Sequence, residues 1–300
     1  YRNLRTNDKK RYMLSASLSY DITDWLNISG RVRVDNSSTK YEQKLYASSN
    51  TTLTEGSAQG FYAISKPDET QVYADALANI NKRLGDYSIV VNIGASIVDN
   101  KYDELSYRGP IRANGIPNVF NVFDLDNTQK KARQDEWEEQ TQSIFASAEV
   151  GWKSMLYLTL TGRNDWNSRL VNTDEESFFY PSIGLSGIIS EMVKLPEFIS
   201  YLKVRGSYTE VGAPVSRSGL TPGTVTTPIV GGALDPTGIY PFTDFKAERT
   251  KSYEFGLSLK LWNKLSAEVT YYHSNTYNQT FLGDLPEYTG SVSYTHLSCR

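Results

Sequence analysis

Apolar and polar residues alternate along much of this chain with a period of two. From Tyr12 to Tyr20 the even positions are apolar, whereas most odd positions are serine. Beyond a turn near Trp25, apolar residues return at every second position, and Arg31 and Arg33 lie between them. Because successive side chains of a strand point to opposite faces, the pattern predicts β-strands with one apolar and one polar face.

The same two-strand pattern recurs about four more times along the chain. The paired segments are 72–80 with 87–97, 144–152 with 156–160, 179–189 with 202–208, and 253–261 with 265–271. We therefore expect about ten antiparallel strands of roughly 9–11 residues, the length at which a tilted strand crosses a bilayer.

The predicted connections alternate between short and long. The long ones cover about residues 36–69, 99–141, 165–177 and 211–250. Up-and-down barrels of outer membranes have this asymmetry, with short turns on the periplasmic side and long loops outside. A soluble sandwich with Greek-key connections has no reason to sort its loops in this way. The predicted fold is therefore an all-β, transmembrane, antiparallel up-and-down β-barrel.

The five tryptophans support a membrane assignment. Trp25, Trp152 and Trp262 lie beside short turns, while Trp137 and Trp166 are expected near the opposite strand ends. Transmembrane barrels carry aromatic residues at both membrane interfaces.

Composition narrows the possible functions. Mean hydropathy is -0.46, which by itself suggests a soluble protein, but a barrel wall carries its lipid contact in alternate residues only. No run approaches the length of about 18 apolar residues that predicts a membrane helix. A net charge of -3 without a basic face argues against nucleic acid as a partner.

Residues for catalysis are scarce. The only histidines are His273 and His296, and Cys299 is the single cysteine. The run Ser37–Lys40 matches a Ser-x-x-Lys pattern in a predicted polar loop, without its partner motifs, and we interpret it as chance. Asp124–Asn127 could offer oxygen ligands to calcium but reads better as a solvated turn. The sequence therefore predicts neither an enzyme nor a cofactor nor a metal site.

The polar faces of the predicted strands hold the remaining candidates for function. Charges of both signs on one face are typical of a wet lumen, where they form a substrate path, contact a plug or hold the wall together through ion pairs. The candidate residues facing the lumen along the substrate path are Arg31, Arg33, Arg163, Asp165, Trp166, Lys203, Arg205, Glu254, Lys260 and Glu268.

Several ordered motifs between about residues 145 and 282 resemble the SusC/RagA family of TonB-dependent importers. They are LTLTGRNDWNS at 158–168, FFYPS at 178–182, LKVRGSY at 202–208, SYEFG at 252–256 and YYHSNTYNQ at 271–279. Residues 1–140 match only through their alternation.

The resemblance implies a 22-stranded barrel of the bacterial outer membrane with an N-terminal plug, driven by TonB. It also implies a SusD-like surface lipoprotein as partner and an oligosaccharide or peptide as substrate. On this interpretation residues 1–290 are part of the barrel, without the plug or the segment that contacts TonB. Residues 291–300 break the pattern, and we interpret them as a non-native tail.

Three other functions compete with this interpretation. A passive porin-like barrel would lack a plug, an outer-membrane enzyme is disfavoured by the shortage of histidine, and a soluble β-rich adhesin has no need of aromatic girdles.

Overall fold

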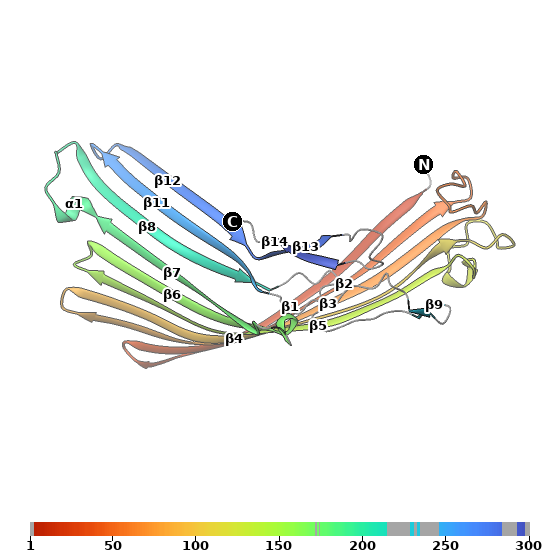
Figure 1. Ribbon diagram of the computed structural model, residues 1–300, viewed down its shortest axis with the longest axis horizontal. Coiled ribbons are helices and arrows are strands. Elements are labelled where there is room, and N and C mark those ends of the chain that lie inside the picture. The colour runs from red at the N-terminus through yellow and green to blue at the C-terminus, as the bar shows by residue number, and fades with distance from the viewer. Residues whose placement is uncertain are drawn as a thin grey trace. The chain divides into compact units, whose positions relative to one another are not determined.

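Ten strands form one antiparallel sheet in which spatial neighbours follow chain order (Figure 1). The computed structural model describes residues 3–171, 173, 175–214, 229–230, 233–234, 246–283 and 293–297. The sheet contains β1 (Leu4–Thr23), β2 (Leu26–Tyr46), β3 (Gly60–Leu84), β4 (Tyr87–Pro110), β5 (Lys131–Trp152), β6 (Leu156–Asn167), β7 (Ser177–Ile188), β8 (Ile199–Ala213), β11 (Glu248–Leu261) and β12 (Leu265–Tyr277). The predicted all-β, up-and-down order of about ten strands is confirmed.

The first five strands are much longer than predicted, at 20–25 residues each. The predicted loops 36–69 and 99–141 shrink to 47–59 and 111–130, and Ser37–Lys40 lies within β2. The prediction was wrong here because backbone groups of a polar strand still pair across the sheet. Such a strand exposes polar residues on both faces, so no apolar alternation marks it in the sequence.

The short turns fall close to the positions that the pattern predicts. Lys153 and Ser154 have positive φ (51° and 58°), as have Trp262 and Asn263 (48° and 57°). Both turns close with a backbone hydrogen bond of 2.9 Å, from Met155 to Trp152 and from Lys264 to Leu261. Two central residues of positive φ define the type I′ turn, whose twist matches that of the adjoining strands.

The other elements are small. The helix α1 (Ile189–Met192) starts the connection between β7 and β8, and η1 (Val122–Asp124) and η2 (Ser168–Leu170) are single turns. Among the described residues, no helix has the length and apolar character needed to span a membrane. Two short pairs stand apart from the main sheet: β9 (Ile229–Val230) with β10 (Ala233–Leu234), and β13 (Gln279–Gly283) with β14 (Ser293–Leu297).

The pair β13–β14 includes part of the predicted tail. Residues 293–297 pair with β13 and are not part of the ten-stranded sheet. Residues 291, 292 and 298–300, including Cys299, lie outside the described residues. The non-native origin of the tail remains a prediction.

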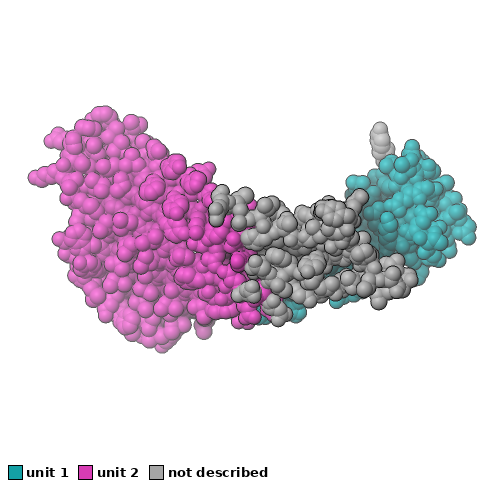
Figure 2. Space-filling model, viewed as in Figure 1, with its two compact units in different colours: residues 1–17, 31–74, 98–140 teal, residues 18–30, 75–97, 141–300 magenta. Residues whose placement is uncertain are grey.

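The chain divides into two compact units (Figure 2). Unit 1 comprises residues 1–17, 31–74 and 98–140, and unit 2 comprises residues 18–30, 75–97 and 141–300. Because each of the strands β1–β5 contributes residues to both units, a unit here is a portion of several strands and not a segment of the chain.

Unit 2 shows the two predicted faces directly. Leu257 of β11 lies opposite Val204 and Val269, whereas its neighbour Ser258 lies opposite Lys203 and Glu268. We call these the apolar face and the polar face of the sheet. Large side chains of the apolar face are well exposed, with Leu257 at 39% and Val269 at 64%. Within the described residues of unit 2 no second layer covers them, as a wall that contacts lipid requires.

Unit 1 has a small apolar core of its own. The side chains of Phe61, Tyr62, Ile111 and Leu125 are buried where the connections 47–59 and 111–130 meet the strand ends. The Ser57 hydroxyl donates to the carbonyl of Ile111 at 2.6 Å and so ties the two connections together. These connections are therefore packed structures in their own right.

Candidate functional site

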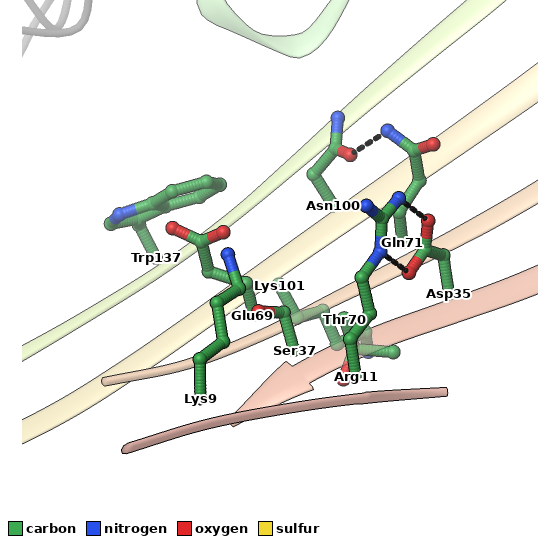
Figure 3. Close-up of a pocket in the computed structure, with 10 residues that line it drawn as sticks. All are labelled: Lys9, Arg11, Asp35, Ser37, Glu69, Thr70, Gln71, Asn100, Lys101 and Trp137. Carbon is green, nitrogen blue, oxygen red and sulfur yellow. Dashed lines mark hydrogen bonds and ion pairs between the residues drawn. The ribbon is translucent and has the colours of Figure 1, made fainter. Parts of the chain in front are cut away.

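A polar hollow of about 410 Å³ opens on unit 1 and is the first candidate site (Figure 3). It is lined by Lys9, Arg11, Asp35, Ser37, Glu69, Thr70, Gln71, Asn100, Lys101 and Trp137. These residues come from β1–β5, and most occupy the alternate positions that continue the polar face beyond the apolar segments. Extension of the strands thus builds about half of this wall from segments where the sequence predicted loops, at Ser37, Glu69, Asn100, Lys101 and Trp137.

One side of the hollow is held by a bidentate ion pair. Arg11 Nε donates to Asp35 Oδ1 at 2.8 Å, and Arg11 Nη2 donates to Asp35 Oδ2 at 2.5 Å. These hydrogen bonds from Arg11 lower the pKa of the Asp35 carboxyl below its usual value. Because the fork of a guanidinium matches a carboxylate, the pair fixes both side chains on the wall.

Amide side chains continue this wall. Gln71 Nε2 donates to Asn100 Oδ1 at 2.8 Å, and Arg33 Nη2 donates to Gln71 Oε1 at 3.2 Å. The guanidinium groups of Arg31 and Arg33 lie 5.3 and 5.5 Å from the ring centroid of Tyr73. Arg33 Nε is buried and has no hydrogen-bond partner among the described residues. Two of the predicted lumen residues thus lie together, around Tyr73.

Trp137 lines the other side of the hollow and rests on a second aromatic ring. Trp137 stacks on Tyr102 with ring centroids 5.3 Å apart and planes inclined by 10°. The Tyr102 hydroxyl donates to Glu104 at 2.5 Å, and Ser65 donates to the same carboxylate at 2.6 Å. Burial and the hydrogen bond to Glu104 raise the pKa of Tyr102 to about 12. Hydrogen bonds therefore anchor the ring that supports Trp137.

A second hollow of about 370 Å³ shares Thr70, Lys101 and Trp137 with the first. Four carboxylates line it, those of Asp68, Asp103, Glu136 and Glu138. An ion pair of 3.1 Å with Lys101 neutralises one of these four carboxylates, that of Glu138.

The polar face of unit 2 carries a compact network around Arg163. Its Nε donates to Asp165 Oδ1 at 2.7 Å and its Nη2 donates to Ser143 Oγ at 2.8 Å. Tyr180 Oη donates to the other Asp165 oxygen at 2.5 Å, and the guanidinium lies 5.6 Å from the ring centroid of Phe145. Asp165 is only 6% exposed, so its charge depends on these partners.

A second network of the polar face joins three strands. Arg205 of β8 reaches across β11 to Glu268 and Thr270 of β12, each at 3.0 Å, and it also pairs with Glu254 at 3.2 Å. Gly256 permits this reach, because a Cβ there would lie 2.7 Å from Arg205 Cγ. The missing side chain of Gly256 therefore lets one arginine neutralise two carboxylates.

The structure shows where the ten predicted residues lie. Their role along a substrate path remains a prediction. It brings together Arg31 with Arg33, Arg163 with Asp165, and Arg205 with Glu254 and Glu268. Lys203 and Lys260 lie on the polar face, opposite Ser258 and Tyr201 respectively.

The structure places Trp166 on the opposite face from the lumen-facing position that we predicted. Its partner in the register is Gln142, two positions from Ile144, so it lies on the apolar face and is 41% exposed. Sequence neighbours in a strand cannot share a face, and Asp165 already occupies the polar one.

Sequence analysis missed most residues of the hollow in unit 1. Lys9, Arg11, Glu69, Gln71 and Trp137 lie beyond the apolar segments, and Trp137 was expected near a strand end. In the structure it lies six residues inside β5. The sequence carries one signal for these residues. They lie at odd-numbered positions, in step with the polar positions of the neighbouring segment, after the apolar alternation has ended.

The two aspartates that we considered as calcium ligands form hydrogen bonds and an ion pair within the chain. Asp126 Oδ1 accepts hydrogen bonds from the backbone N–H and hydroxyl of Thr128, and Asp124 pairs with Arg112 at 2.8 Å. The run 124–127 therefore holds its two aspartates in local contacts, and its Leu125 is buried in the core of unit 1. Within the part of the chain that the structure describes, no group of three or more His, Cys, Asp or Glu residues is placed to hold a metal.

Comparison with solved structures identifies similar folds. The chain superimposes on the RagAB peptide importer in its open-open state with a TM-score of 0.79 at 16% identity, covering 98% of this chain and 33% of that one. It also resembles BauA, the ferric preacinetobactin receptor from Acinetobacter baumannii, with a TM-score of 0.57 at 16% identity, covering 97% of this chain and 41% of BauA. The chain thus spans about a third of the length of the RagAB chain that it matches.

Sequence comparison agrees with the fold. No curated protein sequence matches the chain. The family model described as "TonB dependent receptor-like, beta-barrel" matches residues 1–296. The chain therefore belongs to the β-barrel family of TonB-dependent receptors, whose members are outer-membrane transport proteins.

Proposed function

We propose that this chain is part of the wall of a SusC/RagA-type importer, which carries an oligosaccharide or a peptide across the bacterial outer membrane without catalysis. The observation that carries this proposal is the sorting of residues in unit 2. The apolar face of unit 2 is exposed, and its polar face carries paired charges around Arg163 and Arg205. A barrel needs this combination to hold a hydrated path within lipid.

The partners follow from the same proposal. Energy reaches the transporter from TonB, and a SusD-like surface lipoprotein helps to deliver the substrate. The fold similarity to RagAB and the sequence motifs support this assignment. In the family's scheme the predicted residues of the polar face line the substrate path or contact the plug.

Uptake by cells tests the proposal. The complete gene would be expressed with its neighbouring lipoprotein gene in an outer-membrane transport mutant, and uptake of labelled oligosaccharide and peptide pools would be measured. We expect uptake of one pool that stops when TonB is deleted or an uncoupler is added. Uptake that continues under both conditions would instead support the alternative, a passive porin-like barrel.

Labelling of intact cells tests the orientation. A cysteine at Ile116, which is 71% exposed in the connection 111–130, should react with an impermeant maleimide. A cysteine at Asp86, in the short turn between β3 and β4, should react only after the cells are opened. The control protein carries Cys299→Ser alone. The reverse pattern of labelling would contradict the orientation.

A further inference from the structure

We propose that the hollow of unit 1 is a binding subsite for peptides, in which Glu69 takes an amino group, Lys9 takes a carboxylate, and Trp137 supports an apolar side chain. This inference rests on the proposed importer function and selects one of its two substrate classes. It concerns a site that sequence reasoning did not find.

Two charged side chains of the wall form no ion pair within it. Arg11 is engaged by Asp35 through two hydrogen bonds, and Lys101 is paired with Glu138. Within the described residues, Lys9 and Glu69 make no hydrogen bond or ion pair through their side chains. The charges available to a ligand are therefore one of each sign.

Charges of both signs favour a ligand that also carries both. A peptide supplies an ammonium and a carboxylate in one short molecule, and charge-assisted hydrogen bonds are roughly twice as strong as neutral ones. A neutral oligosaccharide offers hydroxyl groups only, so it would gain little from either charge. In Figure 3 the side chains of Lys9, Glu69 and Trp137 lie on one side of the view, apart from the bonded pairs Arg11–Asp35 and Gln71–Asn100.

A supported aromatic ring, that of Trp137, lines the same hollow. One face of Trp137 is covered by Tyr102, which is held through its hydroxyl by Glu104. A side chain fixed in advance loses little conformational entropy when a ligand packs against it. The stack can thus present a flat apolar surface beside the two charges.

The amide groups and the size of the hollow also suit a peptide. Asn100 uses its carbonyl oxygen to accept from Gln71, while its Nδ2 makes no hydrogen bond to any described residue and can donate to a peptide carbonyl. The volume of about 410 Å³ lies within the range of about 300–1,000 Å³ that is usual for small-ligand sites. The hollow suits a short segment of chain and is too small for a folded partner.

Binding to full-length transporter in detergent micelles tests the proposal. The probes are glycyl-tyrosyl-glycine, its N-acetylated form, its C-terminal amide, and a neutral glucose hexasaccharide, each titrated by calorimetry. We expect the free tripeptide to bind most tightly. Removing either terminal charge should weaken binding about fivefold, the scale of roughly 1 kcal/mol for an ion pair that solvent can reach.

Charge variants show which group meets which end. In Glu69→Gln, acetylation should no longer weaken binding, while amidation still does; Lys9→Gln should show the converse. Lys10→Gln is the matched control, because Lys10 is the next residue of β1 and does not line the hollow. It should leave all affinities unchanged. Lys9 and Glu69 are both exposed, so we expect these variants to fold, which heat-modifiable gel mobility can check.

Two results would overturn the peptide subsite. One is tighter binding of the hexasaccharide than of the tripeptide, with no effect of Glu69→Gln or Lys9→Gln. The other is energised uptake of peptides by cells that the two variants leave unchanged. By contrast, charge-dependent tripeptide binding without any energised uptake would support the subsite and count against the importer function.

Discussion

Unit 1 and unit 2 contain portions of the same first five strands, but they solve different physical problems. In unit 2 the large apolar side chains lie on one exposed face, and the polar side chains on the other face pair among themselves. In unit 1 the outer parts of the strands, such as 36–46 and 131–140, are largely polar on both faces, and buried apolar side chains gather in a core between two connections. The comparison teaches that a strand needs alternation only where its two faces meet different solvents.

The two units also differ in how their charged side chains are paired. Ion pairs and hydrogen bonds on the polar face of unit 2 link neighbouring strands around Arg163 and Arg205. The hollow of unit 1 leaves Lys9 and Glu69 without bonded partners among the described residues. The proposed peptide subsite assigns ligand recognition to unit 1.

The core of unit 1 gives the largest expected effect. Phe61 is 3% exposed, so Phe61→Ala should leave a cavity and destabilise unit 1 by about 3–5 kcal/mol. Proteolysis of the connections 47–59 and 111–130 in the full-length protein would report this loss. Phe123→Ala is the control, because Phe123 is 87% exposed and its removal should change the cleavage rate little. Similar cleavage of both variants would mean that the buried cluster is not a core.

The apolar face of unit 2 gives the next effect. An arginine that faces lipid at the bilayer midplane costs about 2–4 kcal/mol, whereas one in a lumen stays hydrated. Leu257→Arg should therefore lower the folding stability of the full-length protein in bilayers by that order, and Ser258→Arg should be tolerated. Tyr253→Arg, nearer the end of the apolar stretch, should be milder. Equal costs at Leu257 and Ser258 would mean that the faces are assigned wrongly.

Comparison within β6 should show a smaller effect. Asp165→Ala leaves Arg163 and the Tyr180 hydroxyl without their carboxylate, which should cost about 1–3 kcal/mol. Trp166→Ala removes a side chain from the opposite face, so it should leave that network intact. Thermal unfolding in bilayers measures the first effect. Asp165→Asn keeps one acceptor oxygen, for Arg163, so a partial recovery of stability in this variant would attribute that part to hydrogen bonding and not to charge.

The smallest expected effect is the pH dependence that Tyr102 and Glu104 give to the stability of unit 1. Hydrogen bonds from Ser65 and Tyr102 lower the pKa of Glu104 below its usual 4.5, so their stabilisation is present above that pH and lost as the pH falls. Burial and Glu104 raise the pKa of Tyr102 from 10.0 to about 12, so this contribution is present below pH 10 and lost as the pH rises towards 12. The stability of unit 1 should therefore be highest between these limits. In Tyr102→Phe the alkaline loss should become smaller, whereas Tyr62, whose pKa burial and Glu42 also raise, keeps its own share. An alkaline loss of unchanged size would contradict the assignment.

The sequence by itself determined the fold class and most of unit 2. Alternation in segments such as 253–261 predicts strands and faces, because one side must be apolar in lipid and the other polar in water. The same logic identified the polar-face residues Arg163, Arg205, Glu254 and Glu268. Alternation could not show which of them pair, since pairing depends on the register between strands and on the space above Gly256.

Only the tertiary structure decided the extent of the first five strands and the hollow of unit 1. Segments such as 36–46 and 131–143 are polar on both faces, so their hydrogen bonding to neighbouring strands leaves no trace in the hydrophobic pattern. The hollow brings Lys9 within the same wall as Trp137, which lies 128 positions later in the chain. Such a site depends on strand order and on matched strand lengths, which are properties of the folded sheet and not of any one segment.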